Sequence, residues 1–477
     1  YKIIAENVEV VGSNESETFE VVRMSNGNVD IKVYRKTKKN DKKSLFYHRE
    51  FKYKETKEIN LYGLGSKDRF EISGNTKKSI LIRIISGTGK DEIIDQSRVR
   101  GVKKLTRVYD KVDNAIISGS SETKDLTSND KYLNTYNRDR FKANKTVPLI
   151  KIGYNIDDGV FLGGGIGLKK HGWRKVPFAS KHEVFGIIAV KTGSFSLSHN
   201  STFYQVIKKW DLNIKTELLA PNAVTNFYGL GNETEDIEGD LRFNRVRYNQ
   251  GISHLSLEKA IGKSALFSIG PKYEFIQTQQ SSDRFISSDL AGLTDDDFDQ
   301  NHLVGMESSF KLSTVNDKVQ PSSGLRLNIN GNGMYNASDD NYLSAFKSDI
   351  AFYVPIKTVF SPVLALRFGG STILGDFLFN QANTLGAQSK QLGSGNLRGY
   401  RRDRFAGRST AYQNTDLRLK LTSFTSYLFP GDIGVHGFVD NGRVWMDGEE
   451  SSTWHTAYGG GVWVSPFHTL LFITTFE

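Results

Sequence analysis

The chain contains no cysteine among its 477 residues. This absence excludes disulfide frameworks, thiolate metal sites and cysteine nucleophiles together. No run of about 18 apolar residues occurs, so the sequence predicts no transmembrane helix. Proline is scarce, with 9 residues, whereas glycine (45), tyrosine (20) and phenylalanine (30) are abundant. Abundant aromatics and glycine without a helix-favouring repeat indicate an all-β protein.

Motifs for enzyme chemistry are also missing. The nine histidines are scattered, without an H-x-H or H-E-x-x-H arrangement, and no G-x-S-x-G or Walker lysine loop occurs. We therefore expect no catalytic residue, no resident metal and no cofactor. The stretch "SGTGKDEII" (86–94) partly matches a calcium-binding nonapeptide. That motif needs stacked copies, so a glycine turn between strands is the favoured interpretation.

The charge balance is mildly basic. Lysine and arginine number 63 against 53 acidic residues, a net charge of +10. This excess suits phosphate-bearing partners, although a soluble surface that happens to be basic explains it equally well. The chain starts at Tyr1 without a signal peptide. We therefore expect it to be a mature or trimmed piece of a longer precursor.

The pattern of the chain changes near its first third. Residues 1–114 are polar and lysine-rich with short β-like segments, which predicts a soluble β-rich domain, and 115–147 reads as a polar linker. From 148 to 477, segments of about ten residues alternate strictly between apolar and polar positions, as in a transmembrane β-barrel. In "DLRLKL" (416–421), for example, three leucines face away from Asp416, Arg418 and Lys420.

The barrel half contains fifteen predicted strands. Connections after even-numbered segments are mostly short, and several after odd-numbered ones are long, an asymmetry typical of outer-membrane barrels. Because single-chain bacterial barrels have even strand counts, we expect a sixteen-strand type whose last strand is missing from this chain. The fifteen predicted segments are 148–156, 159–169, 182–191, 194–206, 210–219, 241–256, 264–279, 300–313, 323–333, 341–353, 361–373, 411–425, 432–445, 456–465 and 468–476.

The longest predicted loop, 374–410, contains "LRGYRRDRFAG" (397–407), with four arginines around one glycine. Together with "YQNTDLRLKL" and "GFVDNGRVW" downstream, this stretch resembles the signature of the BamA/TamA-type outer-membrane insertase superfamily. "NFYGLGNET" (226–234) is also similar to sequences of that superfamily. The resemblance covers about 148–477, and it implies a sixteen-strand barrel in which the loop after strand eleven folds back into the lumen.

An arginine inside a barrel needs acceptors, because a desolvated, unpaired cation is costly. Alternation places Asp416 on the polar face of its strand, and Asp440 can project inward from the next. The resemblance matches both to acidic wall positions. We expect Arg398 to bridge them and hold the loop, Gly399 to allow a tight turn, and Tyr400 to contact the wall. For Arg401, Arg402 and Arg408 we expect no such role in holding the loop. Their side chains are expected to be solvated or to contact headgroup sugars.

The resemblance also implies a weak seam between the first and last strands, where a client strand could add by edge pairing. The first strand would present Ile150, Ile152 and Tyr154 at this edge. The glycines Gly163, Gly164 and Gly165 either loosen its register or form a small-residue patch under the loop. We therefore expect an outer-membrane protein, with residues 1–114 in the periplasm.

The predicted function is insertion of outer-membrane proteins, or translocation of proteins or lipoproteins, without covalent chemistry. Expected partners are outer-membrane lipid and lipopolysaccharide, unfolded clients and accessory subunits, and no nucleic acid. Residues 1–114 show little helical periodicity, which disfavours the βααββ modules common in the family. "YGLGSKDRFEISGN" (62–75) is similar to a connector in members that carry an upstream metallophosphatase. The alternative function is thus the membrane anchor of a phosphoesterase domain absent from this chain, and a passive pore is a third.

Overall fold

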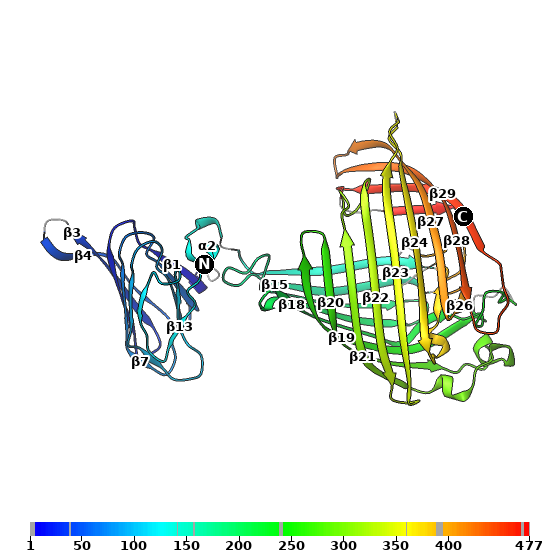
Figure 1. The fold of residues 1–477 in the computed structure, drawn as a ribbon, viewed down its shortest axis with the longest axis horizontal. Coiled ribbons are helices and arrows are strands. Elements are labelled where there is room, and N and C mark those ends of the chain that lie inside the picture. Colours follow the sequence, from blue (N-terminus) through cyan, green and yellow to red (C-terminus); the bar gives the residue numbers. More distant parts are fainter. Residues whose placement is uncertain are drawn as a thin grey trace. The chain divides into compact units, whose positions relative to one another are not determined.

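A computed structural model describes residues 5–37, 40–140, 142–155, 158–237, 242–358, 360–387, 395–468 and 472–476. The chain divides into two compact units, Tyr1–Ala143 and Asn144–Glu477. Among the described residues, no helix has the length and apolar character needed to cross a membrane. Each unit is built almost entirely from β-strands (Figure 1).

The first unit is a parallel β-solenoid. One five-stranded sheet runs in the order β1-β5-β8-β11-β13, and its neighbouring strands are all parallel. A second sheet has the order β12-β9-β6-β2-β3-β4, in which β3 and β4 form an antiparallel hairpin at one edge. A short pair, β10-β7, completes the coil. The strands are β1 (Asn7–Val11), β2 (Glu17–Arg23), β3 (Val29–Thr37), β4 (Asn40–Phe51), β5 (Glu58–Tyr62), β6 (Arg69–Ser73), β7 (Asn75–Thr76), β8 (Leu81–Ile85), β9 (Glu92–Asp95), β10 (Arg98–Val99), β11 (Thr106–Tyr109), β12 (Ile116–Ser118) and β13 (Thr123–Asp125).

Successive coils stack with acidic residues at one corner. The backbone N–H of Glu17 donates to the carboxylate of Asp68 at 2.8 Å, and the backbone N–H of Asp68 donates to Asp91, 23 residues further on, also at 2.8 Å. Asp68 and Asp91 are fully buried, and burial raises the pKa of Asp68 to about 8 and that of Asp91 to about 6. The stretch 86–94 is therefore one corner of the solenoid, with a second corner stacked on it.

The solenoid interior is a continuous apolar core between the two sheets. Phe19 and Phe70, neighbours on β2 and β6, stack with ring centroids 4.6 Å apart, and both are fully buried. The solenoid extends into the range expected to be a linker, since β12 and β13 lie between 115 and 147. A short helix α2 (Lys131–Asn134) and the 3-10 turn η1 (Arg138–Arg140) follow. Among the described residues, no group of three or more histidine or acidic side chains is arranged to hold a metal ion.

Within the described residues, the second unit is one antiparallel sheet of fifteen strands in sequence order (Figure 1). Each of the fifteen predicted segments corresponds to a strand, and the predicted all-β barrel fold is confirmed. The strands are β14 (Lys145–Asn155), β15 (Gly159–Lys170), β16 (Ser180–Ala189), β17 (Phe195–Ile207), β18 (Trp210–Asn226), β19 (Arg245–Ile261), β20 (Ala265–Gln279), β21 (Asn301–Ser313), β22 (Gly324–Asn336), β23 (Asn341–Pro355), β24 (Val363–Gly375), β27 (Ser409–Thr425), β28 (Pro430–Trp445), β29 (His455–Pro466) and β30 (Phe472–Phe476).

The two faces of the barrel wall differ in chemistry. On β20, Ile269 and Tyr273 are 39% and 40% exposed and belong to the outward face. The alternate position Lys272 forms ion pairs with Glu274 at 3.4 Å and with Glu307 on β21 at 3.3 Å. Apolar residues thus cover the outer face, and charged residues pair across the inner face, as the alternation predicts.

The long connections lie at the barrel end opposite the start of β14, because successive strands are antiparallel. They follow β18, β20, β24 and β28. The connection after β20 contains three 3-10 turns, η2 (Phe285–Ser287), η3 (Asp289–Ala291) and η4 (Asp295–Phe298). The connection after β24 contains η5 (Phe379–Gln381) and the short strands β25 (Asn383–Leu385) and β26 (Phe405–Gly407).

Candidate functional site

The connection between β24 and β27 is an ordered loop with its own small sheet. Strands β25 and β26 pair antiparallel, so the loop leaves and re-enters the wall side by side. Residues 388–394 of the expected loop lie outside the described residues. Leu397 is fully buried in an apolar cluster with Leu385 and Phe405 of the loop and with Tyr412 and Val444 of the wall. This packing positions the next residue, Arg398, against the wall.

Arg398 contacts two carboxylates on neighbouring strands. Its Nε and Nη2 donate to Asp440 at 2.7 and 2.6 Å, and its backbone N–H donates to the same carboxylate at 3.0 Å. Nη1 donates to Asp416 at 2.8 Å. The guanidinium carbon also lies 3.8 Å from the ring centroid of Phe438. The guanidinium cation of Arg398 is thus held by two carboxylates and an aromatic ring. Hydrogen bonds between ionised groups are stronger than those between neutral groups.

Both carboxylates belong to the inner face of the wall. Leu417 on β27 and Val439 on β28 are 48% and 44% exposed and face outward, so Asp416 and Asp440 next to them face inward. Asp440 is fully buried, and Asp416 retains 13% of its side-chain exposure. The buried carboxylate is the one that accepts three of the bonds. An uncompensated charge there would be costly, so Arg398 and Asp440 depend on each other.

Gly399 and Tyr400 complete the turn that carries Arg398. Gly399 has φ of +82°, in the left-handed region that favours glycine. The Tyr400 hydroxyl donates to the carbonyl of Thr456 on β29 at 3.3 Å, and its ring contacts Phe405 and His455. The structure therefore brings Arg398, Asp416, Asp440 and Tyr400 together at the wall beside β27, β28 and β29.

The other arginines of the loop also have specific positions. The expectation that Arg402 is solvated is wrong, since it is only 6% exposed. The reason is that the carbonyl of Arg402 accepts from Asn226 on β18 at 3.2 Å, which draws this part of the loop against the opposite strands. Arg404 donates to Thr234 at 2.6 and 2.9 Å. Arg408 donates to Asp447 at 2.6 Å and to the carbonyl of Gly375 at 2.8 Å.

A second loop, 227–237, joins this assembly through Asn232, which is fully buried. Its backbone N–H donates to both oxygens of Glu449, at 2.8 and 2.7 Å, and its side-chain nitrogen donates to Ser451 at 2.8 Å. Its side-chain oxygen accepts from the backbone of Val444 at 3.0 Å. Asn232 thus fastens the loop after β18 to the loop after β28, 217 residues away.

The same second loop contacts the arginine loop directly. The backbone N–H of Gly231 donates to the carbonyl of Ala406 in β26 at 2.7 Å. From β18, Thr225 donates to Asp403, which also accepts from Thr384 in β25 at 2.7 Å. Sequence reasoning missed Asn232 and Asp403. The similarity of "NFYGLGNET" to the superfamily drew attention to Asn232 but gave it no role.

The two ends of the barrel sheet are β14 and β30. Within the described residues, β14 pairs with β15 and β30 with β29, and no pairing joins β14 to β30. On β14, Ile150, Ile152 and Tyr154 are 81%, 69% and 66% exposed. The apolar face of the first strand is therefore open along its length.

The glycines on β15 have different surroundings. A Cβ on Gly163 or Gly165 would lie 2.7 or 2.6 Å from the ring of Phe185 on β16, whereas a Cβ on Gly164 would meet nothing within 4 Å. Two of the three glycines thus make room for an aromatic ring on the inner face. The nearest atoms to Gly163 and Gly165 belong to β16 and not to the arginine loop, so both interpretations given for the glycine run stay predictions.

A family model, the Omp85 superfamily domain, matches residues 193–476. The chain belongs to the Omp85 superfamily. It is accordingly a bacterial outer-membrane β-barrel of the BamA/TamA type, and its general function is outer-membrane protein insertion or translocation. The match covers the strands that carry Arg398, Asp416 and Asp440, and it begins after the first three strands of the barrel.

One solved structure shows the same fold at low identity, and two others are similar more distantly. BamA from Haemophilus ducreyi lacking POTRA domains 1–3 is 13% identical, with a TM-score of 0.52 over 77% of this chain and 70% of that one. CdiB from Acinetobacter baumannii (11% identity, TM-score 0.39) and from Escherichia coli (12%, 0.43) match 74% and 73% of this chain. These matches span 57% and 60% of the two CdiB chains. No curated protein matches the sequence.

Proposed function

We propose that this Omp85 barrel inserts or translocates proteins through a lateral seam between its terminal strands, while Arg398 holds loop 376–408 inside the lumen. The observation that carries the proposal is the bonding of Arg398 to Asp416 and Asp440, at 2.6 to 2.8 Å, from a loop to two inward-facing wall positions. A loop bonded in this way braces the wall next to β29 and β30, so that movement is concentrated at the seam.

The edge of β14 supports the position of the seam. A free strand edge offers a row of backbone donors and acceptors, which a partner strand can satisfy by pairing. Ile150, Ile152 and Tyr154 lie on one exposed face of β14. A client strand with outward apolar residues would continue this surface toward lipid. Residues 1–143 then lie in the periplasm, where a soluble solenoid meets clients and accessory subunits.

The seam is tested by site-specific cross-linking in cells. Because the chain has no cysteine, Ile152→Cys introduces a single thiol on the proposed edge. Ile329→Cys places an equivalent thiol on the outward face of β22, where Ile329 is 45% exposed but both strand edges are paired. The probe is a stalled outer-membrane protein with one cysteine in its last strand. Cross-linking at Ile152 but not at Ile329 is expected, and equal yields at both positions would contradict a seam.

The alternative function, anchoring an upstream phosphoesterase, concerns sequence before Tyr1. The observation in its favour is the similarity of residues 62–75 to a connector in members that carry such a domain. The two functions differ in the same experiment, because an anchor has no reason to hold a client strand at β14. Absence of any client cross-link, with the barrel correctly folded, would therefore favour the anchor.

A further inference from the structure

One corner of the solenoid has an excess of positive charge. It is formed by the four connections that lead from the six-stranded sheet to the five-stranded sheet, and it includes the pair β7–β10 (β7 is labelled in Figure 1). These connections contain nine basic residues and two acidic ones, whereas those of the opposite corner contain three and five. The connections of the basic corner are 52–57, 74–80, 96–105 and 119–122, and those of the opposite corner are 12–16, 63–68, 86–91 and 110–115.

Backbone hydrogen bonds stack the connections of the basic corner on one another. The N–H of Arg98 donates to the carbonyl of Gly74 at 3.0 Å. The N–H of Arg100 donates to the carbonyl of Thr76, also at 3.0 Å. Successive coils thus bring their cations onto one continuous surface. All nine basic residues are exposed, namely Lys52, Lys54, Lys57, Lys77, Lys78, Arg98, Arg100, Lys103 and Lys104.

Acidic side chains neutralise little of this surface. Glu55 pairs with Lys52 at 3.4 Å. Glu122 is buried, and it accepts hydrogen bonds from backbone N–H groups. Lys57 pairs with Glu6 at 2.8 Å. Among the residues that the structure describes, the other seven basic side chains of the corner form no ion pair.

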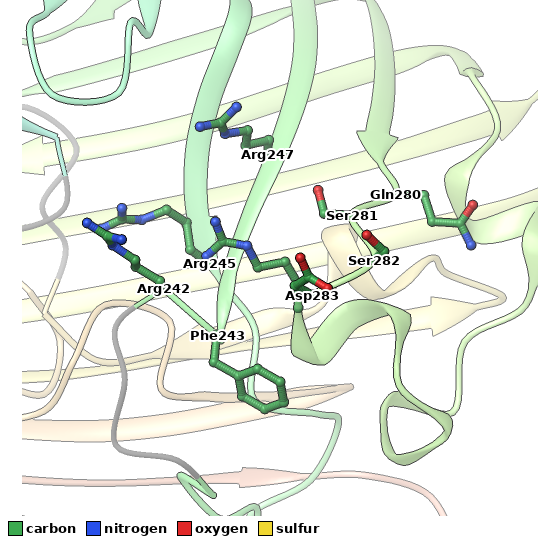
Figure 2. A pocket seen from close by; sticks show the side chains of 9 residues that line it. Arg242, Phe243, Arg245, Arg247, Gln280, Ser281, Ser282 and Asp283 are labelled. Carbon is green, nitrogen blue, oxygen red and sulfur yellow. The ribbon is translucent and has the colours of Figure 1, made fainter.

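The barrel also gathers arginines, around a pocket of about 570 Å³. Figure 2 shows Arg242, Arg245 and Arg247 among the side chains that line this pocket. Arg242 and Arg245 have interaction partners within the protein. The exposed cations of the solenoid corner differ from them, because most of these cations are available to an external partner.

The tip of the connection 96–105 is apolar. Val102 is 100% exposed, and it lies in the sequence between Arg100 and Lys103. Gly101 has φ of +133°, which favours glycine, and a Cβ there would meet nothing within 4 Å. The tip therefore presents one apolar side chain among exposed cations. Apolar side chains flanked by lysine and arginine are typical of segments that bind the surface of an anionic bilayer.

We propose that the basic corner of the solenoid binds the surface of a bilayer that contains anionic phospholipids, with Val102 entering the headgroup region. Anionic headgroups attract clustered lysine and arginine over roughly one Debye length, about 8 Å at physiological salt. The solenoid is joined to β14 of an outer-membrane barrel through residues 126–144, so it is tethered to a bilayer. The proposal rests on the proposed placement of residues 1–143 in the periplasm, which makes the periplasmic leaflet the partner.

The contact is measured on the full chain in nanodiscs, in which both bilayer surfaces are accessible. Because the chain has no cysteine, Val102→Cys accepts a single environment-sensitive fluorophore. The matched control is Val112→Cys, at a 42% exposed position of the opposite corner. The discs contain phosphatidylcholine alone or together with phosphatidylglycerol, and a spin-labelled lipid serves as the quencher. Hydrogen exchange at the buried residues Phe19 and Phe70 checks that the solenoid is folded in each variant.

Quenching at position 102 is expected to be about fivefold stronger in phosphatidylglycerol discs than in phosphatidylcholine discs. It should disappear at about 1 M NaCl, where the Debye length is about 3 Å. Position 112 should remain unquenched in both discs. Adding Arg100→Glu and Lys103→Glu should abolish the quenching at position 102. Adding Lys67→Glu and Lys90→Glu, which change exposed lysines of the opposite corner, should leave it in place.

Equal quenching at positions 102 and 112, or none at position 102, would overturn the proposal. Equal quenching in the two kinds of disc would do the same, because charge would then play no part. Poly-glutamate is the second probe, since it offers the charge of an acidic protein segment without lipid. If it shifted the emission at position 102 while lipid did not quench it, the corner would be a site for acidic protein. Cross-linking at Ile152 is measured separately in cells, so failure of the seam and failure of the bilayer contact are distinguishable.

Discussion

Arg398 and Asp440 are joined by three hydrogen bonds, one of them from the backbone of Arg398 itself. The backbone bond persists when the side chain is changed, whereas the two guanidinium bonds do not. Because Asp440 is fully buried, its charge requires the guanidinium. Changes to the Arg398 side chain therefore test the ion pair separately from the backbone hydrogen bond that also joins the loop to Asp440.

Replacement of Arg398 by lysine is therefore expected to destabilise the barrel even though the charge is kept. A lysine cannot reach both carboxylates in a fork, and breaking a buried pair costs about 3–5 kcal/mol. The measurement is the urea midpoint for loss of heat-modifiable gel mobility. Asp440→Asn should cost a similar amount, and the double variant Arg398→Met/Asp440→Asn should cost less than the sum.

Arg326→Lys is the control for this pair, since Arg326 on β22 donates to the carbonyl of Lys318 at an exposed position. Its midpoint should equal that of the parent. An Arg398→Lys midpoint that also matched the parent would show that the loop does not depend on the ion pair.

Much of this site was predictable from the sequence. Alternation along "DLRLKL" put Asp416 on the inner face, and one glycine among four arginines marked the turn at Gly399. The role of Asn232 was not predictable, because it depends on contact between loops 217 residues apart. The alternation of apolar and polar residues indicates which face of a strand a side chain lies on. It carries no information on which distant loop that side chain contacts.

The solenoid escaped prediction for a related reason. Its coils stack in parallel, and the hairpin β3–β4 is inserted between the first and second coils, so that Glu17 meets Asp68 at a separation of 51 residues while Asp68 meets Asp91 at 23. A repeat with unequal spacing leaves one recognisable motif, at 86–94. A single copy was too little to indicate stacking.

The buried aspartates of the solenoid predict that the first unit loses stability as pH rises. The folded-state pKa is raised to about 8 for Asp68 and about 6 for Asp91. A carboxyl group whose pKa is raised by folding stabilises the folded state fully when the pH is below its ordinary pKa of about 3.9. This stabilisation is lost as the pH rises through the pKa of the folded state. Hydrogen exchange at the backbone amides of Glu17 and Asp68, corrected for intrinsic rate, should speed up between pH 5 and pH 9.

The variant Asp68→Asn tests whether Asp68 causes this pH dependence of hydrogen exchange. An asparagine keeps the side-chain oxygen that accepts from Glu17 and removes the titrating proton. The variant should exchange more slowly than the parent at pH 9, and its exchange should depend much less on pH. An unchanged pH dependence in Asp68→Asn would assign the effect to another group.

Asn232→Ala is expected to release the loop after β28. The change leaves the backbone N–H of Val444 without its buried acceptor, which costs about 1–3 kcal/mol. Limited proteolysis within 446–454 should become faster, while the arginine loop keeps its bonds to the wall. Asn232→Asp should be worse than alanine, because it brings a carboxylate beside Glu449. Equal proteolysis of parent and alanine variant would mean that Asn232 does not fasten the two loops.

Gly369 on β24 is expected to tolerate no side chain. A Cβ there would lie 2.3 Å from Cζ of Tyr412, whose hydroxyl accepts from Arg367 at 2.9 Å. Gly369→Ala must displace the ring and this bond together, and we expect a cost of about 1–3 kcal/mol. At Gly437 on β28 a Cβ would meet its nearest atom at 3.9 Å. Gly437→Ala should therefore leave the urea midpoint unchanged or raise it slightly, because alanine restricts the unfolded chain. If Gly369→Ala and Gly437→Ala unfolded at the same urea concentration, the close packing of Tyr412 would not be the reason for a glycine at position 369.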